Sequence, residues 1–223
     1  MSSRRGPEAG FSMTELMVAV GIVGVLVAMA APRFRETQSN QRVRSASRAV
    51  GDAFLLAREL AIQTRNNQII YFGTTATTDA CGNALQGPAG TPVPLLILDD
   101  GPPGAGTNCC IDAGETTITE PAEAGVAWGV TFAGAKNPSD VGGGDFTTGA
   151  TFTDQAGVQT RWVMFRPDGI PVGFTGACVV GSIGSGGGGV YVTNGTRDYS
   201  AILTPLGGVK LRGFELEAAV WQN

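Results

Sequence analysis

Residues 16–31 form an apolar run in which no side chain carries a charge. A run of this composition predicts a helix that crosses a membrane. The residue directly before it, Glu15, is an ionisable carboxylate. A carboxylate within a membrane span costs about 2.5 to 3.5 kcal/mol on insertion scales, and such residues usually have a partner or a function. Glu15 therefore constrains the interpretation of the whole segment.

Processing of the chain would create a partner for Glu15. A cut between Gly10 and Phe11 frees an α-amine one helical turn away, because residues i and i+4 of a helix face each other. The stretch GFSMTE at residues 10–15 resembles the class III signal of type IV pilins and of the pseudopilins of type II secretion systems. The resemblance implies that a prepilin peptidase, which is also an N-methyltransferase, cuts after Gly10 and methylates Phe11. It further implies that Glu15 neutralises the N-terminus of a neighbouring subunit during fibre assembly.

The apolar run has two other interpretations. The stretch AMA at residues 28–30 has the small residues that an ordinary signal peptidase recognises. Against that cut, Glu15 stands where the apolar region should begin, Pro32 lies next to the cleavage site, and the helical pattern continues beyond it. A plain signal-anchor helix keeps the span and leaves Glu15 without a partner.

Length and composition suit one domain plus an anchor. The chain has 223 residues, 34 of them glycine, and charged residues make up 15 %, which favours a loop-rich β domain over a helical one. Histidine is absent, so Ser/His/Asp and Cys/His catalytic sets are impossible. We therefore expect a protein that is not an enzyme and has no cofactor.

The charge is unevenly distributed along the chain. Residues 33–65 carry seven arginines and three acidic residues, a net charge of +4, whereas residues 66–223 carry six basic and fourteen acidic residues, a net charge of −8. A basic segment after a membrane span can contact anionic headgroups. An acidic head is a poor surface for DNA.

Four cysteines follow the anchor, at Cys81, Cys109, Cys110 and Cys178. An even number on the exported side predicts two disulfides, with three pairings open. A bond between the adjacent Cys109 and Cys110 would be strained, so we expect each of them to join Cys81 or Cys178. The alternative, a metal site, matches no zinc spacing and has no histidine to contribute.

Residues 11–65 predict one long helix. It is apolar all round as far as residue 31, and then an apolar stripe recurs every three or four residues from Val43 to Ala61. Such a stripe implies packing against a head, and Pro32 should kink the helix. The expected segments are a leader (1–10), a transmembrane or fibre-core helix (11–32), its amphipathic continuation (33–66) and a β-rich head (67–223).

Turn-rich segments separate short β patterns in the head. The predicted strands are residues 68–72, 93–98, 116–118, 127–132, 162–165, 189–193, 199–204 and 208–211. Residues 74–90, 99–114 and 137–149 are predicted loops, and the glycine-rich residues 184–189 predict a flexible connection. The fold class is therefore α+β, with a long pilin-type helix packed on an antiparallel head of two small sheets.

A second resemblance lies in the head. The FRPDG turn at residues 165–169 and the strand–turn–strand pattern of residues 199–211 resemble the turn and closing hairpin of GspH/FimT-type minor pseudopilins. This implies a minor subunit near a fibre tip. From the residues alone, Gly169 is expected to take positive φ in a β-turn.

Two binding functions were also considered. Asp99, Asp100, Asp112 and Glu115 suggest a calcium loop, but their spacing is not that of an EF-hand, so we expect no metal. Some FimT-type pilins take up DNA during natural transformation, and the matching candidates here are Arg197, Lys210 and Arg212.

The expectation from the whole sequence is a structural minor pilin or pseudopilin. It would sit in the bacterial inner membrane as a single-pass protein with a periplasmic head, and then join other pilins in a type IV pilus or a type II secretion pseudopilus. A DNA-binding minor pilin is the alternative.

Overall fold

The computed structural model describes residues 12–73, 78–87, 90–102, 104, 107–132, 145–215 and 219–222. The chain divides into two compact units, Met1–Ser39 and Asn40–Asn223. Gly10 and Phe11, the predicted processing and methylation residues, lie outside the described residues.

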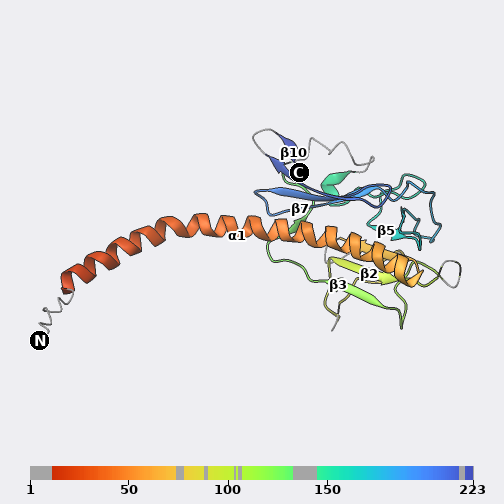
Figure 1. Cartoon of the computed structure of the whole chain (residues 1–223), viewed down its shortest axis with the longest axis horizontal. Coiled ribbons are helices and arrows are strands. Elements are labelled where there is room, and N and C mark those ends of the chain that lie inside the picture. The colour runs from red at the N-terminus through yellow and green to blue at the C-terminus, as the bar shows by residue number, and fades with distance from the viewer. Residues whose placement is uncertain are drawn as a thin grey trace, which may run out of the picture. The chain divides into compact units, whose positions relative to one another are not determined.

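Helix α1 (Met13–Thr64) matches the long helix predicted from sequence (Figure 1). Pro32 lies inside it, and the helix continues through this position. A proline has no N–H to donate to the carbonyl four residues earlier, here that of Ala28, and this is the reason to expect a kink. The kink itself stays a prediction. The helix ends at Thr64 because Arg65 takes a φ of 59°, a left-handed conformation that terminates helices.

The first sheet has the strand order β3-β2-β1-β5-β6, and all its paired strands are antiparallel. Its strands are β1 (Gln68–Phe72), β2 (Leu95–Asp99), β3 (Thr117–Glu120), β5 (Trp162–Phe165) and β6 (Pro171–Val172). All five residues of the central strand β1 are buried. Its alternate side chains enter two different cores, Ile70 and Phe72 on one face and Ile69 and Tyr71 on the other.

The second sheet has the order β10-β9-β8-β7-β4 and is also antiparallel. It consists of β4 (Ala127–Trp128), β7 (Gly188–Thr193), β8 (Asp198–Leu203), β9 (Val209–Glu215) and β10 (Val220–Gln222). A short 3-10 helix, η2 (Phe146–Thr148), precedes β5 in the chain. The predicted α+β class with two small antiparallel sheets is confirmed.

The C-terminal half of α1 packs between the two sheets (Figure 1). Its buried stripe, which includes Val50, Phe54, Ala57 and Ala61, shares one core with residues of both sheets. Phe54 contacts the rings of Phe72 and Phe152, with centroids 6.3 and 5.9 Å away. The apolar stripe seen in the sequence is thus the surface that joins helix and head.

One predicted strand is shorter than expected. The pattern at residues 127–132 predicts six residues, but β4 stops at Trp128. The N–H groups of Thr131 and Phe132 donate instead to the carboxylate of Asp198, at 3.0 and 2.7 Å. A buried carboxylate therefore takes the donors that would have continued the ladder.

The prediction of a flexible glycine connection is wrong for Gly188 and Gly189, although Gly189 was also included, correctly, in the predicted strand 189–193. Both lie in strand β7 and are buried. A Cβ on Gly188 would meet the ring of Phe152 at 2.7 Å, and one on Gly189 would meet the hydroxyl of Tyr191 at 3.0 Å. These glycines make room for aromatic side chains. Strands β6 and β10 were not predicted, because two or three residues carry too little pattern.

Two disulfides staple the loops of the head, Cys81–Cys110 and Cys109–Cys178. Their Cα atoms are 5.6 and 5.5 Å apart, within the usual range for a disulfide. The prediction that each of the adjacent cysteines joins a distant one is confirmed.

Candidate functional site

The first turn of α1 holds Glu15 in a reciprocal pair with Ser12. The backbone N–H of Glu15 donates to Ser12 Oγ at 3.2 Å. In return, the backbone N–H and the hydroxyl of Ser12 both donate to Glu15 Oε2 at 3.4 Å. Ser12 lies directly before the helix and Glu15 is its third residue.

This arrangement is a capping box, in which two side chains satisfy N–H groups that the start of a helix leaves without partners. The negative charge of Glu15 also lies at the positive end of the helix dipole. Sequence reasoning missed this role, although the signal was present as Ser-x-x-Glu directly before the apolar run. Glu15 is therefore held at the helix start before any other subunit contacts it.

The surface that follows Glu15 is apolar and exposed. Every residue from 12 to 38 is exposed, with Leu16 at 60 % and Val20 at 64 %. By length and composition α1 is able to cross a membrane. Burial of apolar surface gains about 25 cal/mol per Å², so contact with lipid or with other apolar helices would stabilise this half of the helix.

Residues 5–31 match a family model described as the prokaryotic N-terminal methylation motif. This match supports a type IV pilin-like protein. It covers Gly10, Phe11, Glu15 and the whole apolar run. No curated protein and no solved structure matches the chain. The motif implies processing by a prepilin peptidase and assembly with other pilins.

The turn predicted at residues 165–169 packs on the end of the pilin-like helix. Gly169 has a φ of 73°, as expected, and its N–H donates to the carbonyl of Arg166 at 2.7 Å. A Cβ on Gly169 would meet Ile62 Cδ1 at 2.7 Å. The β8–β9 turn reaches the same helix, where Arg58 Nη1 donates to the carbonyl of Gly207 at 3.4 Å. The β-turns of both head motifs therefore pack against the C-terminal end of α1.

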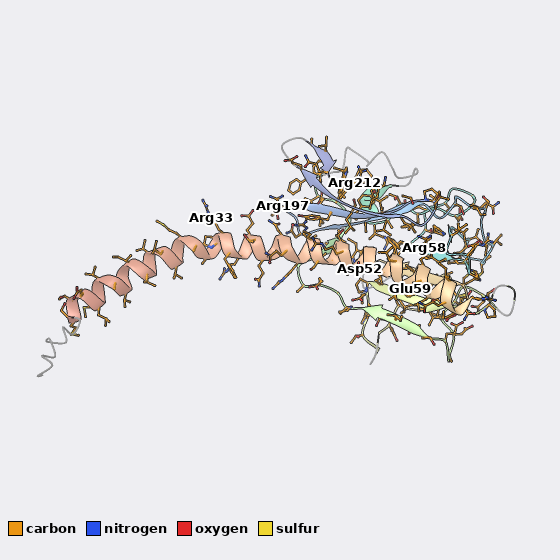
Figure 2. The ribbon with its side chains drawn as sticks, in the orientation of Figure 1. Arg33, Asp52, Arg58, Glu59, Arg197 and Arg212 are labelled. Atoms are coloured by element: carbon orange, nitrogen blue, oxygen red, sulfur yellow. A yellow bond between two sulfur atoms is a disulfide. The ribbon has the colours of Figure 1, made fainter. Side chains whose placement is uncertain are left out.

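A groove of about 300 Å³ in the head gathers basic side chains. Two come from the second sheet, Arg197 before β8 and Arg212 on β9, on the same side of α1 (Figure 2). Two more, Arg44 and Arg48, come from α1. We call this depression the arginine groove. Its wall also contains Ser47, Tyr199, Leu211, Gly213, Phe214, Glu215 and Gln222.

The groove includes two of the three predicted DNA-contact residues. Arg197 and Arg212 line it, whereas Lys210, which is exposed on β9, does not. Sequence reasoning missed Arg44 and Arg48 as site residues. Their signal was a spacing of four residues, which places two side chains on one face of a helix.

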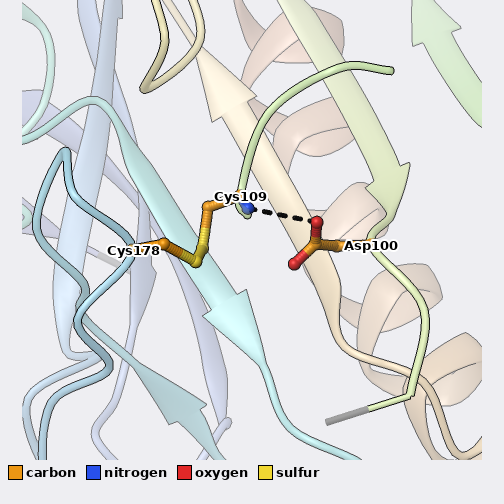
Figure 3. Close-up of side chains that lie close together, drawn as sticks. All are labelled: Asp100, Cys109 and Cys178. Atoms are coloured by element: carbon orange, nitrogen blue, oxygen red, sulfur yellow. Dashed lines mark hydrogen bonds between the residues drawn. A yellow bond between two sulfur atoms is a disulfide. The ribbon is translucent and has the colours of Figure 1, made fainter. Parts of the chain in front are cut away.

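A second cluster of side chains lies around the disulfide between Cys109 and Cys178 (Figure 3). A carboxylate oxygen of Asp100 and the sulfurs of Cys109 and Cys178 lie within 4.8 Å of one another. The backbone N–H of Cys109 donates to Asp100 Oδ1 at 3.1 Å. Because the two sulfurs are bonded to each other, they supply no thiolate, and the cluster offers a metal a single carboxylate. Its geometry is that of a structural staple.

The pKa of Asp100 is raised to about 6, chiefly by burial. Hydrogen bonds from the Cys109 and Asn108 backbone lower this pKa, and the negative charges of Glu115 and Asp112 raise it. Burial also raises the pKa of Glu115. In the stretch that suggested a calcium loop in the sequence, Asp99 accepts from Asn66 Nδ2 and Asp112 accepts from Asn108 Nδ2, both at 2.8 Å. These carboxylates are engaged with protein donors.

Proposed function

We propose that this chain is a structural, non-enzymatic minor pilin or pseudopilin of the GspH/FimT type. The observation that carries the proposal is the exposed apolar half of α1 with a single carboxylate, Glu15, held at its start. An apolar helix of this kind is stable in a bilayer before assembly and within a bundle of similar helices afterwards.

Glu15 supplies the register of assembly in this proposal. A charge without a partner in an apolar helix bundle is strongly disfavoured. The α-amine that cleavage frees at Phe11 of a neighbouring subunit is a partner of opposite charge. Pairing of the two fixes the axial position of each new helix against its neighbour.

The head belongs on the oxidising side of the membrane. The disulfides Cys81–Cys110 and Cys109–Cys178 form and persist in compartments such as the bacterial periplasm. The proposal therefore places the anchor in the inner membrane and the head in the periplasm, and the machine is either a type IV pilus or a type II secretion system.

The test is the mass of the mature chain after expression with a prepilin peptidase. Cleavage after Gly10 gives a chain that begins with methylated Phe11. Gly10→Leu should leave an uncut precursor, whereas Gly6→Leu, in the same leader, should be cut normally. A mature chain that begins at Ala31 would show ordinary signal-peptide processing and overturn the proposal.

DNA binding is the second candidate function, and the arginine groove favours it because it holds Arg197 and Arg212 beside two further arginines. The net charge of −8 over residues 66–223 opposes it, since association with a polyanion is driven by positive charge. Binding of an oligonucleotide by the full-length chain at two salt concentrations tests it. Steep salt dependence that Arg197→Ala reduces more than Lys210→Ala does would support a DNA-binding pilin.

A further inference from the structure

The arginine groove is built to receive carboxylates. Among the described residues, the guanidinium groups of Arg44, Arg48 and Arg197 have no carboxylate partner. Guanidinium groups present planar, paired donors that match the geometry of a carboxylate. Four guanidinium groups line a groove of about 300 Å³ and repel one another. An anionic occupant would therefore stabilise the groove.

A group of carboxylates lies on the opposite face of the same helix. Glu120, at the end of β3, and Glu123 are both exposed, and they line a small depression together with Ala46 and Ala49 of α1. Among the described residues, neither carboxylate has a basic partner. We call this pair of carboxylates the acidic edge.

Helical geometry separates the acidic edge from the arginine groove. Successive residues of an α-helix are rotated by about 100°, so Ala46 faces about 200° away from Arg44. In agreement, β3 and β10 lie on opposite sides of α1 in Figure 1. The acidic edge of one copy therefore cannot fill its own groove, although the two surfaces lie at the same level of the helix.

The geometry points to a head-to-tail contact in which Glu120 and Glu123 of one copy enter the arginine groove of a second copy. A contact between two different surfaces of the same molecule leaves one free surface of each kind, so it extends into rings or helical filaments. This inference rests on the proposed function and adds to it that copies of this chain are neighbours in the assembly, meeting through these two head surfaces.

The charges favour a protein partner over a nucleic acid. Glu215 stands in the groove wall, and the rest of the head is acidic, so a long polyanion meets repulsion on both sides of the groove. A short segment with two carboxylates avoids the acidic surface outside the groove, and inside it meets four guanidinium groups against the one carboxylate of Glu215. Charge complementarity of this kind sets the partner and register more than it sets affinity.

The experiment measures association between full-length chains held one per micelle in a nonionic detergent. Two differently labelled samples are mixed and their association is followed by fluorescence cross-correlation. The paired change Arg44→Glu with Arg48→Glu should weaken association at least about tenfold, and Glu120→Lys with Glu123→Lys should do the same. Mixing the two variants should restore it, because the unaltered edge of the groove variant meets the unaltered groove of the edge variant, and the reversed groove meets the reversed edge.

The control is Arg35→Glu with Arg42→Glu, which makes the same change in net charge on the same helix outside the groove. It should associate like the unaltered chain, because its groove and its acidic edge are both unchanged. Equal association of the groove variant and the unaltered chain would overturn the inference. So would binding of an oligonucleotide to the groove without association of the chains.

Failure of this inference differs from failure of the proposed function. Glu15→Ala changes only the anchor, so this variant should keep the head contact even though it would not assemble into a fibre. Loss of fibres with an intact head contact would then concern the anchor alone. An intact fibre without any measurable head contact would contradict the groove contact and would leave the proposed pilin function unaffected.

Discussion

Ser12 and Glu15 satisfy each other's backbone N–H groups at the start of α1, at 3.4 Å to the Glu15 carboxylate and 3.2 Å to the Ser12 hydroxyl. The carboxylate thus has a structural partner within its own chain. Assembly would give it a second partner, the amine of a neighbouring Phe11. Glutamine also serves in a capping box but carries no charge, so substitutions can separate the two roles.

We expect Glu15→Gln to keep the helix start, to be cleaved after Gly10, and to be excluded from fibres, because only the charge is lost. Ser12→Ala should remove the cap, at a cost of about 1 kcal/mol in helix stability, and should still assemble. The measurement is the fraction of each chain in sheared fibres, with its mass as a check on cleavage. Normal incorporation of Glu15→Gln would show that the cap, not the charge, is what assembly requires.

Gly169→Ala should destabilise the head more than Gly157→Ala. Both glycines have positive φ, 73° and 78°, so each substitution costs about 1 to 2 kcal/mol in backbone conformation. A Cβ at Gly169 also meets Ile62 at 2.7 Å, whereas one at Gly157 meets nothing within 4 Å. The overlap should add about 1 to 3 kcal/mol.

Thermal unfolding of the full-length chain in detergent, followed by tryptophan fluorescence, compares the two glycine variants. Equal losses of stability would mean that Ile62 of α1 moves away from the new Cβ without a loss of stability. The packing of residues 165–169 on the helix would then be loose.

Removal of Cys109–Cys178 should cost more stability than removal of Cys81–Cys110. The sequence separations are 69 and 29 residues, which correspond to about 4.4 and about 3.6 kcal/mol in the loop-entropy account. Paired serine substitutions and unfolding curves under identical conditions give the comparison. The opposite order would mean that strain or residual structure in the unfolded chain outweighs loop length.

Asp100 should make the head less stable as the pH rises from about 4 to about 6. Its pKa lies near 6 in the folded chain and at 3.8 ordinarily, so the folded state binds more protons in this window and loses that advantage as the carboxyl ionises. Asp100→Asn retains the Oδ1 acceptor for the Cys109 N–H and cannot ionise. Its unfolding temperature should depend less on pH over this range than that of the unaltered chain.

The parallel change Glu123→Gln, at an exposed carboxylate, is the control for the pH measurement and should leave the slope unchanged. If Asp100→Asn kept the full slope, the dependence would have to come from other carboxylates, of which Glu115, with its raised pKa, is the first to examine.

The helix and the longer strands could be predicted from sequence because their patterns are local. The stripe from Val43 to Ala61 has helical period, and β1 and β5 have the predicted bounds. The end of β4 could not be predicted. It depends on Asp198, which is about 70 residues later in the chain, and no local pattern reports such a contact.

The same limit applies to the candidate site. Glu15 and its motif were evident in the sequence because a carboxylate next to an uncharged apolar run is unusual, and a stretch of a few residues is enough to show it. The arginine groove was only half evident, since Arg197 and Arg212 lie in one part of the sequence and Arg44 and Arg48 lie about 150 residues before them. The strand packing that brings α1 against the second sheet supplies the other half.

The adjacency of Cys109 and Cys110 has a consequence for how the chain reaches its folded state. Each belongs to a different disulfide, so exchanging the two partners shifts the connection by a single residue. Oxidation alone therefore does not secure the native pairing. Thiol–disulfide exchange must sort the isomers, and we expect the yield of native head in the cell to follow the activity of a disulfide isomerase.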